Sequence, residues 1–307
     1  MKNRTYWKKH YVVETDADEI ERHVRLTDFV SHAESFEMPY FEMAKTAPNI
    51  LISMGSGGHS YIFAELSYQM HLRGYNVFIM PKHGGYTVDA LVTRHRDALK
   101  FISTNFSGRI GIFGEGLGGY VVFYLALAHA PVKSIVCQNS PAVMTERAYH
   151  DALVNDAGLW RDAARRRKII LPAAKLLVRI VPNLPMPISS YIDWKAIIDP
   201  NPENWDLENH LVAEGYLKDP DFDKWYPLSA IMSLISTPPP NPVESLTIPT
   251  MFLLDQKGPT PAYIIELYNR IPPIKKRIVE IDGSVYWMLS HPRAEARIVC
   301  DWFEETL

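Results

Sequence analysis

The chain has 307 residues and a mass of 35.1 kDa, and 47% of its residues are hydrophobic, which is enough for one large core with an inserted subdomain. Its net charge of −3 and its isoelectric point near 6.4 leave no overall positive field, so we expect no nucleic-acid partner.

The first part of the chain alternates polar and apolar residues only loosely. Residues 11–25 and 29–43 are expected to form an antiparallel edge of a sheet, in which 35–43 is the better candidate strand. Buried strands and helices then alternate. Strands are predicted at 49–53, 76–80, 109–113 and 132–138, and helices at about 61–73, 88–105 and 120–129. This alternation predicts a mostly parallel sheet with right-handed crossovers.

The pattern changes after Pro141. Residues 143–246 are rich in proline and tryptophan and contain no convincing strand, so we expect a helical cap here, closed by a stiff proline-rich linker. The alternation resumes afterwards with strands and helices predicted at 250–254, 261–270, 277–281 and 293–305. The predicted core therefore consists of residues 1–142 and 247–307.

A glycine-rich segment, I-G-I-F-G-E-G-L-G-G-Y at 110–120, joins a predicted strand to a predicted helix. Glycine allows a sharp turn and close packing of a helix on a strand, so we expect a strand, a tight turn and a helix. The spacing is that of the nucleophile elbow G-x-S-x-G, with Gly114 and Gly118 in the two glycine places. Gly116 occupies the place of the nucleophile.

Four segments in this order resemble the α/β-hydrolase superfamily, and most closely its monoacylglycerol-lipase or lysophospholipase-like branch. They are the elbow, S-M-G-S-G-G-H at 53–59, I-P-T-M-F-L-L-D-Q-K-G at 248–258 and V-E-I-D-G-S-V-Y-W-M-L-S-H-P at 279–292. The resemblance covers nearly the whole chain outside the expected cap. It implies the α/β-hydrolase fold, with a mostly parallel central sheet, helices on both faces and an inserted helical cap.

The resemblance also implies a catalytic Ser, Asp and His, in that order along the chain. The matching positions hold Gly116, Gly258 and Tyr286. Without a hydroxyl or thiol at position 116, no acyl-enzyme can form there. A substitution made to trap a substrate would account for Gly116 alone, so three absences together favour a natural departure. The nearest histidine, His291, is in an S-H-P setting typical of the start of the last helix.

Backbone donors of an oxyanion hole do not depend on these side chains. The resemblance places them at Leu117 and at Gly55 or Ser56, where they could hold a carboxylate, enolate or carbonyl oxygen beside a helix N-terminus. We expect Gly55, Ser56, Leu117 and Tyr286 to contact a ligand.

Four side chains are candidates for a catalytic group. At a helix start, the pKa of Glu115 is expected to be low, which makes a weak base and favours a structural role. Tyr286 would need its pKa lowered by about three units to act as a base near pH 7, so donation of a hydrogen bond or simple packing is easier. His59 and His83 follow strands at the ligand-binding edge of the sheet and could act as acid or base, although loop orientation is the simpler role.

Other groups give weaker signals. Asp255, three residues before the expected acid, is a minor candidate. The basic run 165–168 is typical of a solvated helix face, with anionic head groups or a membrane surface as the alternative. The tryptophans of 143–246 are expected mainly to pack, and one or two could line an apolar pocket. These tryptophans are Trp160, Trp194, Trp205 and Trp225.

No group of His, Cys, Asp or Glu has metal-ligand spacing, so neither a metal nor a cofactor is expected. Cys137 and Cys300 are far apart in sequence and form no disulfide motif, which is typical of a protein in a reducing compartment. The first residues are polar and basic and lack the apolar segment of a secretory signal. The longest apolar run, 169–181, is interrupted and too short for a membrane span. A cytoplasmic location without an integral membrane segment is therefore expected.

Three functions remain open. The favoured one is a pseudo-hydrolase that binds a small apolar or acyl-type ligand, as a receptor, carrier or regulatory subunit. The second is a lyase, cyclase, decarboxylase or isomerase that uses the oxyanion donors together with Tyr286, His59 or His83. The third is a hydrolase or esterase with relocated catalytic residues. A name based on the fold alone would call the protein a hydrolase.

Overall fold

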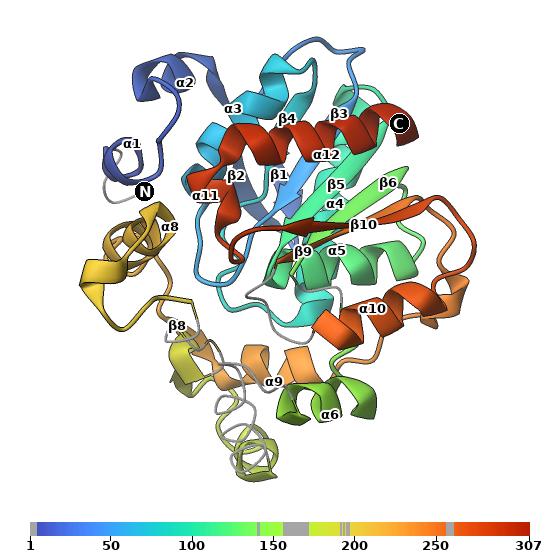
Figure 1. Ribbon diagram of the computed structural model, residues 1–307. Helices are drawn as coiled ribbons and strands as arrows, with labels where there is room; N and C mark the ends of the chain where they lie inside the picture. The colour runs from blue at the N-terminus through green and yellow to red at the C-terminus, as the bar shows by residue number, and fades with distance from the viewer. Residues whose placement is uncertain are drawn as a thin grey trace.

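The computed structural model describes residues 5–139, 142–155, 172–190, 192, 194, 197–255 and 261–307. An eight-stranded sheet of order β1-β2-β4-β3-β5-β6-β9-β10 crosses the molecule (Figure 1). Its strands are β1 (Val24–Ser31), β2 (Glu34–Phe41), β3 (Asn49–Ser53), β4 (Asn76–Ile79), β5 (Ile110–Glu115), β6 (Ser134–Gln138), β9 (Thr250–Asp255) and β10 (Lys276–Ile281). β1 and β2 form an antiparallel edge, and the strands from β4 to β10 are parallel. The predicted sheet is confirmed.

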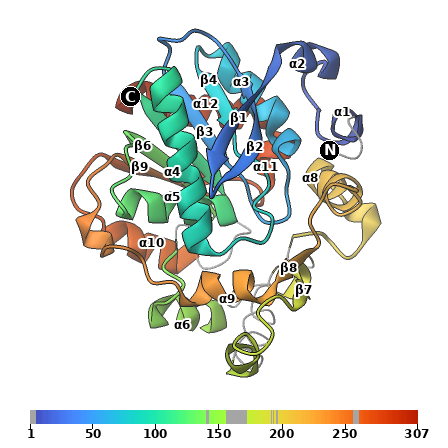
Figure 2. The same ribbon diagram turned by 180° about the vertical axis from the view of Figure 1, so that it is seen from behind.

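Helices cover both faces of the sheet. α3 (Ala64–Leu72), which continues the short turn η1 (Ser60–Phe63), packs beside α12 (Pro292–Thr306) in front of the sheet in Figure 1. α4 (Val88–Asn105) and α5 (Leu117–Leu127) cover the opposite face, which Figure 2 turns toward the viewer. The core strands β3, β4, β5, β6 and β9 are buried along their whole length, as expected for parallel strands covered on both faces.

The N-terminal residues differ from the prediction. Instead of a strand over 11–25, the chain forms α1 (Tyr6–His10) and α2 (Ala17–His23), and the strand begins only at Val24. The side chain of Asp16 accepts a hydrogen bond from the Asp18 N–H at the start of α2, whose first turn is acidic and last turn basic. These capping and dipole signals favour a helix and outweigh the loose alternation of polar and apolar residues.

The described part of residues 143–246 contains short elements. These are α6 (Arg147–Asn155), β7 (Pro185–Pro187), η2 (Ile188–Ser190), η4 (Pro202–Asn204), α8 (Leu207–His210), the π-helical turn η5 (Leu211–Tyr216), β8 (Trp225–Pro227), α9 (Leu228–Ser236) and η6 (Val243–Ser245). The expectation that this stretch lacks strands is wrong, because β7 and β8 pair antiparallel, with Met186 opposite Tyr226. Three-residue strands that contain prolines are too short to show an alternating pattern. Trp160 and the basic run 165–168 lie outside the described residues.

The last part of the chain contains α10 (Pro261–Arg270), α11 (Trp287–Ser290) and α12. His291 is the residue before the first turn of α12, so its predicted place at the start of the last helix is confirmed. Among the described residues, no helix is long and apolar enough to cross a membrane.

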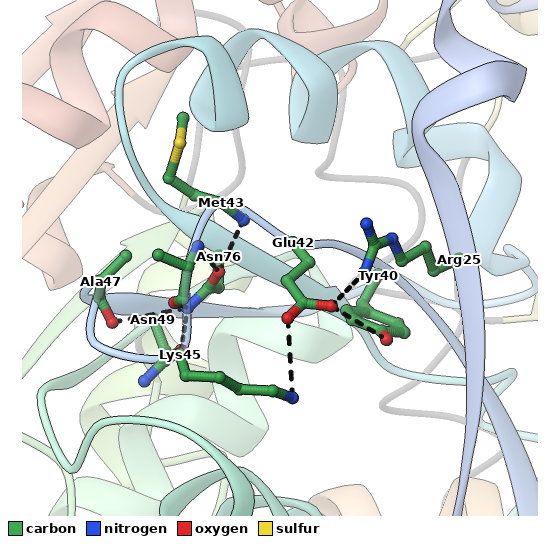
Figure 3. A network of polar contacts seen from close by, with 9 residues as sticks. Arg25, Tyr40, Glu42, Met43, Lys45, Ala47, Asn49 and Asn76 are labelled. Atoms are coloured by element: carbon green, nitrogen blue, oxygen red, sulfur yellow. Dashed lines mark hydrogen bonds and ion pairs between the residues drawn. The ribbon is translucent and has the colours of Figure 1, made fainter.

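A polar network fixes the N-terminal ends of β3 and β4 (Figure 3). The elbow follows the C-terminal end of β5, so the network lies at the other end of the parallel strands. The Asn76 amide accepts hydrogen bonds from the backbone N–H groups of Met43 (2.7 Å) and Ala44 (3.2 Å) and donates to the Asn49 side chain (3.0 Å). Nearby, Glu42 pairs with Arg25 and Lys45. This network holds the connection from β2 to β3 against the start of β4.

Candidate functional site

The glycine-rich segment forms the predicted elbow between β5 and α5. Gly116 has φ 53° and ψ −121°, in a region that residues with a side chain rarely adopt, and α5 begins at the next residue. The Gly116 N–H donates a hydrogen bond to the Gln138 carbonyl oxygen (3.1 Å), and the Tyr120 N–H donates to the Gly116 carbonyl oxygen (3.1 Å). The strand, turn and helix expected from the sequence are confirmed.

The elbow glycines have different steric surroundings. A Cβ atom on Gly118 would lie 2.0 Å from the Ser53 carbonyl oxygen, and one on Gly114 would lie 2.5 Å from the Gly118 carbonyl oxygen. These two glycines are needed because α5 packs directly on the strand backbones. A Cβ atom on Gly116 would have one close neighbour, the Gly55 Cα at 3.5 Å, which is an ordinary contact. A side chain at position 116 is therefore opposed by backbone conformation and not by lack of space.

Glu115 is buried next to the elbow and contacts the glycine-rich loop that follows β3. A Cβ atom on Gly55 would lie 2.2 Å from its Oε2 atom, and its carboxyl accepts a hydrogen bond from the Gly55 N–H. Burial raises the pKa of Glu115 to about 8, with a smaller contribution from the Asp255 carboxylate and against the opposing effect of the Gly55 hydrogen bond. The expected low pKa is wrong, because burial outweighs the effect of the helix start. Because the Gly55 N–H already donates a hydrogen bond to Glu115, the predicted oxyanion donors that remain are the N–H groups of Ser56 and Leu117.

Residues 216–226, called the covering segment below, lie over the glycine-rich loop. The Tyr216 hydroxyl donates a hydrogen bond to the Ser56 carbonyl oxygen (2.6 Å), and the Gly57 N–H donates to the Tyr226 hydroxyl (2.8 Å). Both tyrosines and Ser56 are buried. The covering segment thus holds the loop that carries one of the predicted oxyanion donors.

Gly57 explains how the covering segment approaches so closely. Its φ is +78°, and a Cβ atom there would lie 2.4 Å from the Phe222 ring. The Asp223 N–H donates a hydrogen bond to the Gly57 carbonyl oxygen (2.8 Å). Only glycine combines this backbone conformation with the space that the Phe222 ring occupies.

Tyr286 precedes α11 and lies in an aromatic cluster. Its side chain is 4% exposed, and its ring centroid lies 4.9 Å from that of Tyr216 and 6.4 Å from that of Trp194. Trp194 is therefore one of the tryptophans that pack, whereas Trp225 is 61% exposed. Trp205 donates a hydrogen bond from its indole N–H to a backbone carbonyl.

The loop that carries Tyr286 is anchored by Glu208 of α8. Glu208 is buried, and one carboxylate oxygen accepts the Ser284 N–H (2.9 Å). The Ser284 hydroxyl in turn accepts the Tyr286 N–H (3.2 Å). An acidic residue distant in sequence thereby sets the position of the tyrosine.

His59 and Asp219 form a buried pair between the glycine-rich loop and the covering segment. His59 Nε2 lies 2.7 Å from Asp219 Oδ2, and the Tyr11 hydroxyl donates to the same oxygen (2.7 Å). Burial acts to raise the pKa of Asp219, but the hydrogen bonds from His59, Tyr11 and the Asp221 N–H outweigh it and lower that pKa. The sequence analysis missed Asp219 and Tyr11, because no local motif joins residues this far apart in the chain.

His83 is buried and orients the loop after β3. Its Nε2–H donates a hydrogen bond to the Met54 carbonyl oxygen. Burial lowers the pKa of His83 to about 3, and the neighbouring His95 contributes in the same direction. This hydrogen bond is consistent with the predicted loop-orienting role, and the imidazole is neutral at physiological pH.

Asp255 ends β9 and is buried, and its carboxylate acts on Glu115. Gly258, the predicted counterpart of the acid, lies outside the described residues. Within the described ranges, no three His, Cys, Asp or Glu side chains are grouped so that they could hold a metal ion.

Comparison with known proteins bears on the fold. No family model and no curated protein matches the sequence. Among solved structures, a soluble variant of monoglyceride lipase from Saccharomyces cerevisiae, in complex with a substrate analogue, superposes with a TM-score of 0.69 at 13% identity, over 97% of this chain and 98% of that chain. Monoacylglycerol lipase from Paleococcus ferrophilus gives a TM-score of 0.63 at 17% identity, over 91% and 98%. Epoxide hydrolase VrEH1 from Vigna radiata gives 0.59 at 13% identity, over 92% and 98%. At these identities the likeness establishes the fold, and the residues themselves must carry any argument about function.

Proposed function

We propose that this chain, whose fold is that of the α/β-hydrolases, is a non-hydrolytic pseudo-hydrolase that binds a small apolar or acyl-type ligand at the elbow. The observation that carries the proposal is Gly116 at the turn, with φ 53° and no side chain. Covalent catalysis of acyl transfer needs a hydroxyl or thiol at this place. The elbow keeps its backbone geometry while it lacks the atom that would attack a carbonyl.

The side chains around the elbow support the same proposal. Tyr286, at the position that the resemblance assigns to the base, is buried among aromatic rings. His83 has a pKa of about 3, and its Nε2–H donates a hydrogen bond to a backbone carbonyl oxygen. Because a group with so low a pKa binds a proton weakly, His83 is a poor general base for activating a nucleophile. His59 is held by Asp219 beneath the covering segment.

The ligand position and the division into domains are parts of the proposal. We place the ligand between the Leu117 and Ser56 N–H groups and the covering segment, and we treat residues 143–246 as a cap on a core formed by 1–142 and 247–307. The contacts of Tyr216 and Tyr226 with the loop after β3 support a cap that closes on the core. Two free, buried cysteines suit the proposed cytoplasmic location.

A second candidate function is favoured by Glu115. A carboxyl with a pKa of about 8 is largely protonated at neutral pH and can donate a proton. Beside backbone oxyanion donors, such an acid would suit a lyase or isomerase whose reaction passes through an enolate. This candidate shares the elbow with the favoured function and differs from it in predicting turnover.

The proposal is tested by the intact mass of the purified protein after incubation with excess fluorophosphonate, which labels activated serines. We expect no added mass, whereas an adduct mapped to one serine would contradict the proposal and point to a relocated nucleophile. Native mass spectrometry of the same preparation then identifies what co-purifies. A bound apolar or acyl compound recovered unchanged supports binding, and its conversion on incubation supports the second candidate.

A further inference from the structure

The carboxyl of Glu115 and the empty nucleophile position at Gly116 both border the backbone of Gly55. The carboxyl contacts Gly55, where a Cβ atom would lie 2.2 Å from Oε2 and 3.0 Å from Cδ. The Gly55 Cα in turn lies 3.5 Å from the place of a Cβ atom on Gly116. A ligand that fills the space left by the missing side chain would therefore contact Gly55. The Glu115 carboxyl contacts the same residue.

The groups that face Glu115 are acidic or neutral. Asp255 acts on it from the end of β9, Glu295 from α12, and the Tyr216 hydroxyl from the covering segment. The carboxyls are buried, so their mutual repulsion is weakly screened by water. Such surroundings keep Glu115 protonated and give it an O–H to donate while its other oxygen accepts the Gly55 N–H.

A second observation concerns the buried polar side chains that surround Glu115. Gln138 is opposite Glu115 in the register of β5 and β6 and is fully buried. Its side-chain amide is the hydrogen-bond partner of the buried Glu295 carboxyl. Burial raises the pKa of Glu295 well above its ordinary value, so this pair is neutral and adds no charge beside Glu115.

We infer that Glu115 determines ligand class at the elbow, donating a hydrogen bond to the carbonyl oxygen of an uncharged acyl compound, such as an amide or ketone, and excluding the corresponding carboxylate. This inference rests on the proposed binding function and narrows it. An uncharged carbonyl oxygen accepts a hydrogen bond from the Glu115 O–H and brings no charge into the site. A carboxylate ligand would bring a negative charge into a buried site that already contains the Asp255 carboxylate.

The test compares octanamide with octanoate, which share a chain and differ in charge, by isothermal titration of the full-length protein. At about pH 6.5 we expect octanamide to bind at least about tenfold more tightly than octanoate. As the pH rises through about 8, the affinity for octanamide should fall, because Glu115 loses its proton. Glu115→Gln keeps a donor, so it should still bind octanamide and lose this pH dependence. Glu280→Gln, at an exposed position of β10, should behave like the wild type.

The outcomes separate the inference from the function on which it rests. Binding of octanoate as tight as that of octanamide, or a pH profile unchanged in Glu115→Gln, would overturn the role of Glu115 and leave the binding function in place. If neither compound binds the wild type or the variant at any pH, the proposed binding of acyl compounds is itself contradicted. Circular dichroism and melting temperature establish that each variant is folded.

Discussion

The Tyr216 hydroxyl lies 2.6 Å from the Ser56 carbonyl oxygen and so joins the covering segment to the loop after β3. A buried hydrogen bond of this kind contributes about 0.5–1.5 kcal/mol to stability. In Tyr216→Phe we expect a loss of this size and faster hydrogen exchange at the amides of Ser56 and Gly57. Tyr268→Phe, which removes a hydroxyl bonded to the Lys276 carbonyl, should leave that exchange unchanged. Equal exchange in the two variants would contradict a closed covering segment.

Gly116→Ser should fold and remain inactive toward esters. Its side chain has space, but a non-glycine residue at φ 53° should reduce the free energy of unfolding by about 1–3 kcal/mol. Gly118→Ser should be far more damaging, since its Cβ atom would lie 2.0 Å from the Ser53 carbonyl oxygen. Denaturant unfolding measures both effects. Ester hydrolysis by Gly116→Ser would show that a functional base survives near the elbow.

Asp219→Asn should destabilise the protein at pH 7 by about 1–3 kcal/mol, because it weakens three hydrogen bonds to a buried carboxylate. The pKa of Asp219 is lowered by folding, so its stabilisation is present above the ordinary carboxyl pKa and is lost as the pH falls through the folded-state value. The difference between wild type and variant should therefore shrink in acid. Asp28→Asn, at an exposed position on β1, is the matched control. A pH-independent difference would show that Asp219 does not act through its charge.

Glu115→Gln should have the opposite dependence on pH. Folding raises the pKa of Glu115 from 4.5 to about 8, so the wild type loses stability as the pH rises between these values, by at most about 1.4 kcal/mol per pH unit. The variant has no such group, and its advantage over the wild type should grow from pH 5 to pH 8 and then level off. Unfolding curves at several pH values measure it, and parallel profiles would contradict a buried, neutral Glu115.

Local sequence signals explain how far the fold could be predicted. The glycines at 114, 116 and 118 mark the elbow, because each allows a turn or close contact that other residues oppose. The buried parallel strands are continuous apolar runs, which predict both their positions and their type. The helix α2 was predicted as a strand, although its cap at Asp16 and its first-turn acids are visible in the sequence.

The candidate site was less predictable because its properties come from contacts between distant segments. The pKa of Glu115 depends on burial and on Asp255, from another strand. The bonds from His59 and Tyr11 to Asp219 span 160 and 208 residues, and no spacing rule predicts them. A motif can place a residue at the edge of a sheet, but its partners depend on the tertiary structure.

The most direct test of the central claim is the rate of nitrophenolate release from p-nitrophenyl octanoate at increasing concentrations of purified protein, alongside Tyr286→Phe and His83→Ala. The account predicts a rate equal to that of a mock preparation for all three proteins, because no nucleophile is present at the elbow. Release that rises in proportion to the wild-type concentration and is lost in either variant would contradict it, and would identify a hydrolase with relocated catalytic groups.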